Sequence, residues 1–537
     1  MPELTDNLIG AAWLVAHFQV PPMAPLPVTS RIGTRRATEA VGGFRLETYT
    51  ESMRPADLPA AHLQFHLRHE IPQLEFLSRL FAKSGGDFVQ EWVSREPTGQ
   101  YARRAAFLYE WFTGDALSVP DRLAGNYVPV LDDEKQVTAS AKAVVKDPRW
   151  RVNNNLPGTR YFCPTIVKTD AYLQAAALDV SALFAGLTDE FGEELLLRAA
   201  AWMTLRESKS SFVIEGEGDR TTRIQRFADV MGRRTGEGEL PLTDSASAEL
   251  QREILGDITS VTHYGFRQSP VFVGETVKFS EVVHYVAPVQ EDVADMMEGL
   301  RTFMARTVGQ SSVMRSAVAA FGYVYIHPMA DGNGRVHRFL INDVLRRDGV
   351  IPAPVILPVS AVITEDAGER RAYARVLDAV SAPLMQVVRE NVSFASTRTH
   401  YPDGVVSNFQ FSGADIARPL WRYLDLTTHV LYLSKIIERT ILEQMREESK
   451  YLRAHAQARM ALKEVVEMPD EQADRVLRSI EQNKGQLTNV LAKEIPVLEL
   501  PGIWAAVVDA VEAEFRSEEQ PDPHVVERYH PTKQKKK

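Results

Sequence analysis

Apolar residues recur at helical spacing along most of the chain. From about residue 53 to 115, and again over 417–466, they fall three and four positions apart, which is the period of an amphipathic helix. Residues 469–515 continue as three shorter helices that divide at Gly485 and Gly502. The pattern predicts a mainly α fold.

Other stretches lack this spacing. Residues 266–274 and 281–286 are rich in β-branched and aromatic side chains and are separated by a polar turn, so they predict a β-hairpin. Residues 117–170 hold many turn formers and predict irregular or short β structure, and residues 400–416 predict a loop. Residues 1–40, with many prolines and small residues, predict a partly extended start.

Length and composition are those of a multidomain globular protein. At 537 residues the chain is too long for one compact core. Its hydrophobic share of 45% and charged share of 25% are typical of globular proteins. We expect an N-terminal domain of mixed helical and irregular structure over 1–170, a helical core with the hairpin over 171–395, and a C-terminal helical domain over 396–537.

Charge and cysteine usage exclude several classes of protein. With 61 basic and 71 acidic residues, the net charge is −10, which argues against a broad nucleic-acid surface. Cys163 is the only cysteine, so neither an intrachain disulfide nor a cysteine-based zinc site is expected. The start is acidic and no 18-residue stretch is free of charged and polar breaks, which predicts a cytoplasmic protein without a membrane partner.

The densest chemistry lies in the middle of the chain, where residues 327–338 read HPMADGNGRVHR. Gly332 and Gly334 let backbone N–H groups turn toward an anion. Because apolar residues resume at helical spacing after Gly334, these N–H groups would begin a helix, and the positive end of its dipole favours phosphate. Arg335 and Arg338, three apart on that helix, can reach the same ligand.

Two further side chains complete this set. Asp331 is suited to hold the Mg²⁺ that accompanies a nucleotide. His327, at the end of an apolar stretch, can accept a proton near neutral pH. Each residue alone has an ordinary interpretation as a turn, a helix cap or a packed side chain. Together, in this order, they predict a site for a nucleoside triphosphate.

This run resembles the signature of the Fic family, His-Pro-Phe-x-Asp/Glu-Gly-Asn-Gly-Arg-x-x-Arg. Only Met329 departs from it, standing in place of Phe, and methionine fills a core position of similar size. Fic proteins are mostly nucleotidyl transferases that move AMP from ATP to a hydroxyl of a target protein. The resemblance implies a Fic-type helical core over about 170–395 with a hairpin flap, flanked by helical domains.

The resemblance also assigns a role to each residue of the signature. It implies that His327 deprotonates the attacking hydroxyl and that Asp331 binds Mg²⁺. Arg335 and Arg338 would hold the β/γ end of ATP. Three consecutive residues would hold its α- and β-phosphates: Gly332, Asn333 and Gly334.

A second passage resembles the inhibitory motif of the family, Ser/Thr-x-x-x-Glu-Gly/Asn. It runs here from Ser211 through Glu215 to Gly216. The resemblance implies that Glu215 pairs with Arg338 and competes with the γ-phosphate of ATP for the same guanidinium group. The alternative is an ordinary helix end.

In Fic relatives the hairpin is a flap over the active site, and its edge pairs with the target segment by strand addition. The resemblance therefore places Val273, His284 and Tyr285 in the flap, where the target would dock.

Two other features leave alternatives open. Arg103 and Arg104 lie in an aromatic-rich helix and predict a solvated helix face, with a binding patch as the alternative. Residues 475–491 resemble a degenerate helix-turn-helix. Because the second helix carries one Lys and one Glu, packing or partner binding is favoured over DNA binding.

The leading prediction is a Mg²⁺-dependent protein adenylyltransferase that uses ATP, modifies Ser, Thr or Tyr and is inhibited in cis. The alternatives are a nucleotide-sensing regulatory or toxin–antitoxin-linked interaction protein, and a Fic protein that removes AMP or transfers another phosphate-containing group. The sequence identifies neither the target protein nor the oligomeric state, and self-modification stays among the outcomes.

Overall fold

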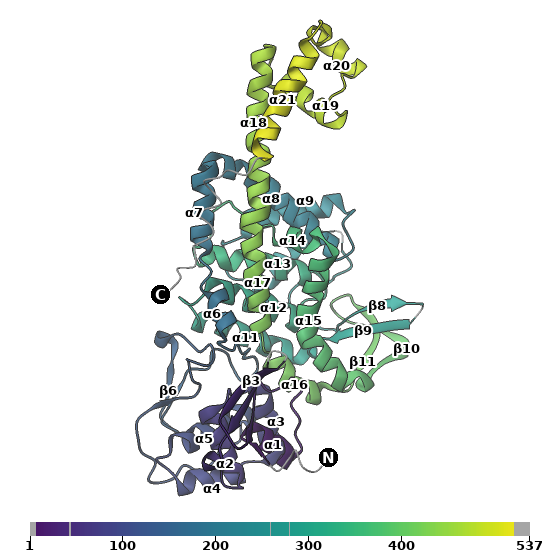
Figure 1. The fold of residues 1–537 in the computed structure, drawn as a ribbon. Coiled ribbons are helices and arrows are strands. Elements are labelled where there is room, and N and C mark those ends of the chain that lie inside the picture. Colours follow the sequence, from purple (N-terminus) through teal and green to yellow (C-terminus); the bar gives the residue numbers. More distant parts are fainter. Residues whose placement is uncertain (1–6, 42–43, 258, 279, 520–537) are drawn as a thin grey trace, which may run out of the picture. The chain divides into compact units, whose positions relative to one another are not determined.

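The computed structural model describes residues 7–41, 44–257, 259–278 and 280–519. The fold is mainly helical with a few small sheets, as predicted (Figure 1). Its contacts divide the chain into two compact units. The first comprises 1–179, 207–353 and 359–437, and the second comprises 180–206, 354–358 and 438–537. The domain boundaries at 170 and 395 stay predictions.

Helices and a four-stranded sheet form the N-terminal part of the first unit. The strand order is β1-β2-β4-β3, with β2 and β4 parallel and the outer pairs antiparallel. The predicted partly extended start contains strands β1, β2 and β3, and the helix α1 within it was not predicted. The elements are β1 Leu8–Ile9, α1 Ala11–Phe18, β2 Val28–Ile32, β3 Ala37–Val41, β4 Phe44–Tyr49, α2 Pro59–His69, α3 Leu74–Ser84, α4 Asp87–Arg95 and α5 Gln100–Thr113.

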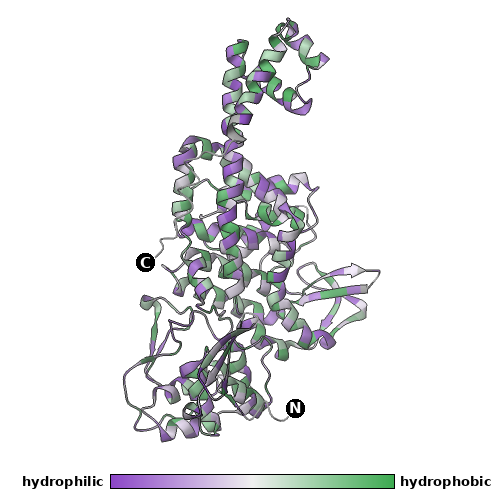
Figure 2. Cartoon of the chain, in the orientation of Figure 1, coloured by the Kyte–Doolittle hydropathy of each residue, from purple (hydrophilic) through white to green (hydrophobic). Residues whose placement is uncertain are grey.

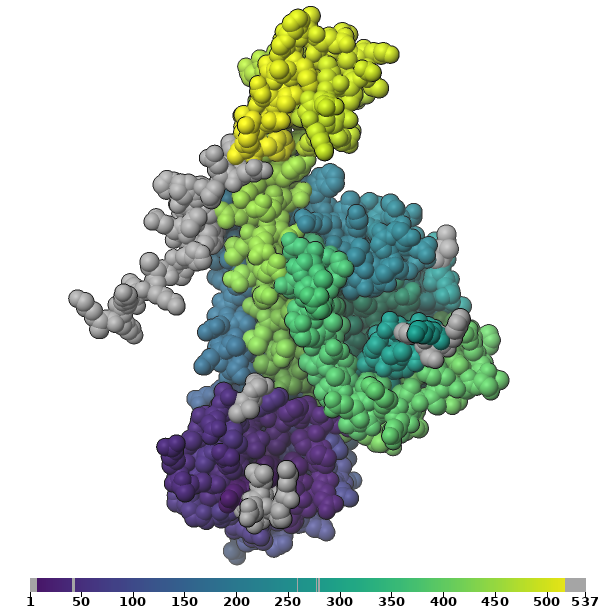
Figure 3. Space-filling view, turned by 45° about the vertical axis from the view of Figure 1, so that its right-hand side comes forward, coloured from purple at the N-terminus to yellow at the C-terminus, as the bar shows by residue number. Residues whose placement is uncertain are grey.

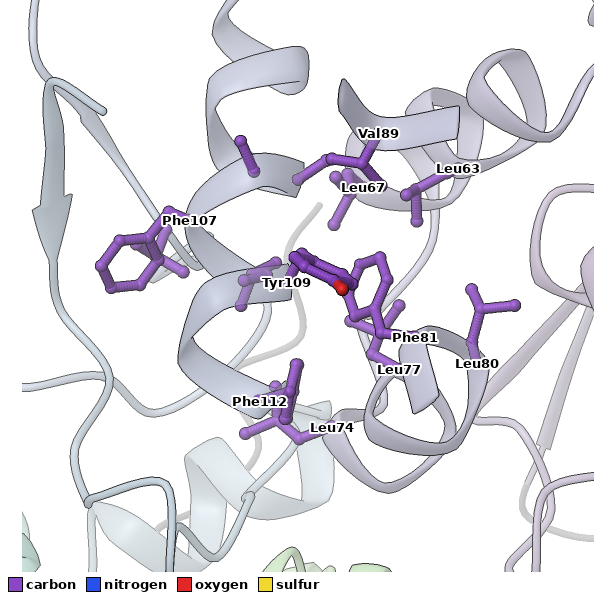
Figure 4. Packing of buried hydrophobic residues seen from close by; sticks show 14 of the residues in the cluster. Leu63, Leu67, Leu74, Leu77, Leu80, Phe81, Val89, Phe107, Tyr109 and Phe112 are labelled. Atoms are coloured by element: carbon purple, nitrogen blue, oxygen red, sulfur yellow. The ribbon is translucent and has the colours of Figure 1, made fainter. Parts of the chain in front are cut away.

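Aromatic and aliphatic side chains of α2, α3 and α5 form the core of this region. Figure 4 shows Tyr109 and Phe112 of α5 packed against Phe81 of α3. The Phe81 and Tyr109 rings meet edge to face, with centroids 5.7 Å apart. The following segment also packs here through its buried Trp150 and Cys163, and it contains the short strands β5 Val128–Pro129, β6 Val145–Asp147 and β7 Val152–Asn154. The prediction of irregular and short β structure is confirmed.

The rest of the first unit is built around two central helices, α12 and α13. The predicted hairpin is present as β8 and β9, although its first strand begins six residues later than expected. The loop predicted over 400–416 was wrong in part, because β10 and β11 form a second hairpin there. The elements are α6 Asp170–Ala176, α9 Thr221–Arg234, α10 Asp244–Leu255, β8 Phe272–Val277, β9 Ser280–Val286, α11 Gln290–Arg306, α12 Ser312–Ile326, α13 Asn333–Arg347, α14 Val359–Glu365, α15 Ala367–Val388, β10 Val392–His400, β11 Val406–Phe411, α16 Ala414–Arg422 and α17 Thr427–Arg439.

The two hairpins pack on each other through aromatic rings. The ring of Phe272 in β8 lies 5.5 Å from that of Phe394 in β10 and 4.8 Å from that of Phe409 in β11. Figure 3 shows the two hairpins side by side at the surface, in teal and green. The second hairpin thereby supports the first.

Helix α8, Glu193–Ile214, begins in the second unit and ends in the first. The second unit also contains α7 Val180–Phe191, α18 Arg446–Val465, α19 Asp470–Gln482, α20 Asn489–Glu494 and α21 Ile503–Glu519. Its core joins Leu462 of α18 to Leu477 of α19 and Val507 of α21. The three helices predicted over 469–515 are confirmed, and the one after the Gly485 turn has six residues.

Polar and apolar residues are mixed along the helices (Figure 2). In the part of the chain that the structure describes, no single helix is long and apolar enough to span a membrane, and one bent pair, α6 with α7, passes that test only in combination.

Both predictions for Arg103 and Arg104 were wrong, because the two side chains are buried. The Arg103 guanidinium donates hydrogen bonds to the carbonyl oxygens of Arg151 at 2.9 Å and Asn126 at 3.0 Å. Arg104 Nε donates to the carbonyl oxygen of Val130 at 3.0 Å. These buried arginines donate to carbonyl groups of the irregular segment that follows α5.

We expect Arg103→Ala to lower the free energy of unfolding by about 2–4 kcal/mol, because the substitution removes a large buried side chain together with its hydrogen bonds to backbone carbonyl groups. Urea unfolding measures this change. Arg95→Ala is the control: its side chain is 53% exposed and pairs loosely with Glu91, and such surface changes cost within about 0.5 kcal/mol. Equal small effects for both variants would contradict the structural role of Arg103.

Candidate active site

The signature loop joins two packed helices, α12 and α13. His327 follows the last residue of α12 and takes a left-handed backbone conformation with φ +52°. Gly332, with φ +92°, precedes α13 and has a conformation that side chains rarely adopt. Six residues thus turn the chain from the end of one helix to the start of the next.

Buried polar contacts fix this loop. Asn333 Oδ1 accepts from the backbone N–H of Met329 at 2.9 Å, and its Nδ2 donates to the carbonyl oxygen of the same residue at 2.8 Å. Met329 is fully buried, as the exchange for Phe predicted. Gln251 Nε2 donates to the carbonyl oxygen of Asp331 at 2.8 Å. The side chain of Asn333 therefore holds the loop, and only its backbone N–H is left for a ligand.

The start of α13 has the form of an anion site. The first N–H groups of a helix have no partner within it, and here they belong to Asn333, Gly334 and Arg335. Arg335 and Arg338 project from the same turn, and both are buried. Buried cations at the positive end of a helix dipole require a nearby anion.

Glu215 supplies that anion. Its carboxylate accepts from Arg338 Nη2 and, at 3.0 Å, from Arg335 Nε, so it bridges the two guanidinium groups. Arg338 also donates through Nε to Ser211 Oγ at 2.6 Å. The sequence predicted the pair with Arg338; the structure adds the contact with Arg335.

The three residues of the predicted inhibitory motif lie at the end of α8. Ser211 is on its last turn, Glu215 follows the last helical residue, and Gly216 has φ +75°. A Cβ atom at position 334 would collide with Glu215 Oε1, so Gly334 is needed for the close approach of this carboxylate. The same space would admit a phosphate oxygen.

Burial and charge act in opposite directions on Glu215. Burial alone raises the pKa of this carboxyl, but the charges and hydrogen bonds of Arg338 and Arg335 outweigh it and hold the pKa below its usual value. The Arg335 guanidinium lies 5.0 Å from the centre of the Phe212 ring and 3.7 Å from Glu217 Oε2. Glu215 is thus ionised at neutral pH. Arg335 in turn is surrounded by carboxylates and an aromatic ring.

His327 is held as a neutral base. Loss of hydration, and then the charge of Arg267, lower its pKa to about 4, although the contact with Val324 and the Glu215 carboxylate act in the other direction. Its Nδ1 lies 3.2 Å from the carbonyl oxygen of Val324. Because a carbonyl oxygen can only accept, Nδ1 carries the proton and Nε2 is the acceptor.

A cleft of about 730 Å³ lies beside the start of α13, within the range of about 300–1,000 Å³ typical of small-molecule sites. Asp331 contributes a side chain that is 50% exposed and lies 3.4 Å from Arg335 Nη2. The lining residues are Arg223, Leu255, Asp257, Thr259, Ser260, Asp331 and Arg335. Among the described residues, no group of three or more His, Cys, Asp or Glu side chains could hold a metal ion by itself.

The three residues predicted for the flap differ in exposure. Val273 is 43% exposed, and His284 is also exposed, with Nε2 3.4 Å from Glu275 Oε1. Tyr285 is buried, and its hydroxyl donates to the carbonyl oxygen of Tyr325 at 2.7 Å. The Tyr285 side chain therefore packs against the end of α12, and docking of a target at these three residues stays a prediction.

Sequence reasoning missed Arg267, Gln251 and Glu217, which all touch the signature or the loop before it. Arg267 and Gln251 act through backbone carbonyl groups, and such contacts leave no pattern in a sequence. Glu217 lies in the acidic run after Gly216, and that local run of charge was the one available indication.

Comparison with known proteins agrees with this geometry. Residues 241–345 match the model of the Fic/DOC family. This part of the chain is a Fic/DOC domain, as the resemblance predicted. Helix α8, with Ser211 and Glu215, lies outside the matched residues.

Curated proteins named as adenylyltransferases match a part of the chain. Protein adenylyltransferase fic-1 of Caenorhabditis briggsae is 38% identical over 113 residues, which are 21% of this chain and 20% of that protein. Protein adenylyltransferase Fic of Drosophila willistoni is 33% identical over 122 residues, 22% of each chain. The chain thus spans about a fifth of the length of the curated relatives it matches.

Two solved structures are similar in part. A Fic family protein from Desulfovibrio desulfuricans G20 has a TM-score of 0.38 and 18% identity, covering 56% of this chain and 82% of that one. A Fic domain containing signaling protein from Bacteroides thetaiotaomicron VPI-5482 has a TM-score of 0.35 and 19% identity, covering 51% of this chain and 97% of that one.

Acid should destabilise the protein through histidines packed around α12 and α13. Burial lowers the pKa of His429 to about 3, against an ordinary value of 6.5. Between pH 6.5 and 3 the unfolded chain binds a proton that the folded chain excludes, so this group costs stability as the pH falls. We expect the loss of unfolding free energy from pH 7 to pH 5 to be about 1–2 kcal/mol smaller in His429→Gln. Urea titrations at the two pH values test this, and equal losses would contradict burial of a neutral His429.

Proposed function

We propose that this chain is a protein adenylyltransferase that transfers AMP from ATP to a Ser, Thr or Tyr hydroxyl and that Glu215 inhibits it in cis. The bridge from Glu215 to Arg335 and Arg338 is the observation that carries this proposal. The Fic/DOC domain and relatives named as adenylyltransferases support the reaction class.

The start of α13 and its arginines would receive the phosphates. Backbone N–H groups of residues 333–335 suit the α- and β-phosphates, and Arg335 and Arg338 suit the β/γ end. While Glu215 bridges the arginines, the γ-phosphate cannot occupy the same donors. ATP would then bind in a pose unsuited to transfer.

The residues present fit a nucleotide-borne Mg²⁺. Mg²⁺ is usually held by one or two carboxylates together with phosphates and water, and Asp331 and Asp257 both line the cleft. Asp331 would be the ligand from the signature. When bound, the ion would neutralise charge that develops on the phosphates.

The state of His327 suits proton removal from a hydroxyl. Its Nε2 would accept the proton of the target hydroxyl, and the hydroxyl oxygen would then bond to the α-phosphorus of ATP. The bond from that phosphorus to the oxygen bridging to the β-phosphate would break, and pyrophosphate would leave with the electron pair. Most of the rate gain would come from positioning and from the cationic surroundings of the phosphates.

The interaction is strong enough to hold the site closed and weak enough to be released. Hydrogen bonds to charged groups contribute about 1.5–3 kcal/mol each, which corresponds to factors of about 10 to 100 in an equilibrium. A partner or ligand that moves the end of α8 would therefore open the site.

We expect Glu215→Gly to raise transfer of label from α-phosphate-labelled ATP to protein by about 10- to 100-fold, self-modification included, because it frees both arginines. His327→Ala in that background should remove transfer and leave ATP binding nearly intact, since the imidazole is assigned to proton removal. Arg338→Ala in the same background should lower transfer.

Glu194→Gly is the matched control. It makes the same exchange in the first turn of the same helix, where the side chain is exposed. Transfer in Glu215→Gly no higher than in the parent would reject cis inhibition. Saturable ATP binding without transfer in any variant would instead support a nucleotide sensor.

A further inference from the structure

One buried arginine joins the signature loop to both ends of the β8–β9 hairpin. Arg267 is 3% exposed and lies between α10 and β8. Its Nε donates to the carbonyl oxygen of His327 at 2.7 Å. Its Nη1 donates to the carbonyl oxygen of Ser269 at 2.8 Å, just before β8, and its Nη2 to that of Pro288, just after β9. A single planar guanidinium group thus holds three backbone segments.

Backbone and side-chain contacts extend this connection. The backbone N–H of Arg267 donates to the carbonyl oxygen of Pro328 at 2.7 Å. The Tyr285 hydroxyl, from β9, donates to the carbonyl oxygen of Tyr325 at 2.7 Å. Three carbonyl groups at the end of α12 and in the loop after it therefore receive their donors from the two ends of the hairpin.

These donors form hydrogen bonds with carbonyl groups at the C-terminal end of α12. The last carbonyl groups of a helix have no partner within it, and a cation is favoured at that negative end of the dipole. His327 also has a left-handed backbone, which few residues other than glycine adopt without support. Because Arg267 is bonded to the carbonyl oxygen of His327 itself, it fixes the orientation of this residue.

A neighbouring carboxylate completes the arrangement. Asp403, at the turn between β10 and β11, accepts through Oδ2 from the backbone N–H of Gln268 at 2.8 Å and from Ser269 Oγ at 2.7 Å. Burial, only partly offset by Tyr285 and Asp403, lowers the pKa of Arg267 to about 10, which still leaves it charged. The second hairpin therefore holds the segment that carries Arg267.

We propose that Arg267 and Tyr285 are positioning residues. They hold the base His327 at a fixed position relative to the β8–β9 hairpin, on whose edge the target segment would dock. This inference rests on the proposed function, since it concerns the same proton transfer. Neither side chain lines the cleft beside α13, so both should affect the chemical step and leave ATP binding unchanged.

The test compares variants in the Glu215→Gly background, with label transfer from ATP to protein as the readout. Arg267→Gln removes the charge and most donors, Arg267→Lys keeps the charge, and Tyr285→Phe removes one hydroxyl. Arg252→Gln is the matched control, because Arg252 is exposed on α10 and lies over the Tyr264 ring. Thermal melting establishes that each variant is folded.

We expect Arg267→Gln to lower kcat about 100-fold, the size of effect that follows from a displacement of about 1 Å, with KM for ATP unchanged. The acid limb of its pH profile should move to higher pH, because the Arg267 charge, which disfavours protonated His327, is gone. Glu215 is the other charge that acts on this imidazole, and it is absent from all these variants, so it does not contribute to the difference. Arg267→Lys should restore the acid limb and part of kcat. Tyr285→Phe should lower kcat about fivefold, as expected for one hydrogen bond.

A merely structural role would lower Tm and leave kcat, KM and the pH profile of the folded protein as in Arg252→Gln, and this result would overturn the assignment. If Arg267→Gln does not fold, Tyr285→Phe decides: an unchanged kcat overturns the proposal and a selective loss of kcat supports it. Absence of transfer in the Glu215→Gly parent would reject the proposed function and this assignment with it. If the Glu215→Gly parent transfers label and the Arg267 and Tyr285 variants have the same kcat and pH profile as this parent, only the assignment of Arg267 and Tyr285 as positioning residues is rejected.

Discussion

Two buried guanidinium groups at the positive end of a helix dipole are the constraint on which the site depends. Arg335 and Arg338 repel each other and are disfavoured at the start of α13 unless an anion lies between them. Glu215 is that anion in this structure, and a triphosphate would meet the same need. Under the proposed function the two anions would require the same donors, so the Glu215 contact and productive ATP binding would exclude each other.

The residues around the two arginines fix the geometry of this anion site. Gly334 leaves room for the Glu215 carboxylate close to the helix start, where a Cβ atom would collide with it. Nearby, burial and the Arg267 charge keep His327 neutral, so in its proposed role as a base it would need no change of protonation before it acts. The hairpin ends hold the carbonyl groups beneath this residue. The start of α13, His327 and the ends of the β8–β9 hairpin are therefore joined by one set of polar contacts.

The sequence predicted those features that depend on residues close to one another along the chain. The signature run places His327, Asp331 and the arginines within twelve residues, and helical spacing after Gly334 indicated the helix start. It did not predict Arg103 or Arg267 as buried residues, because each bonds to carbonyl groups, which every residue type carries. The N-terminal sheet and the β10–β11 hairpin were missed for a related reason. Their strands are stabilised by pairing and by contacts such as Phe272 with Phe409, which short-range periodicity does not reveal.

Isothermal titration calorimetry in a double-mutant cycle tests the central claim most directly. The affinity for Mg²⁺ and an ATP analogue with a methylene group between the α- and β-phosphates, which blocks transfer, would be measured in the parent, Glu215→Gly, Arg338→Ala and the double variant. If the carboxylate and the γ-phosphate compete for one guanidinium group, Glu215→Gly raises affinity in the parent, and this gain falls by about 1.5–3 kcal/mol when Arg338 is absent. Equal gains with and without Arg338 would contradict the account.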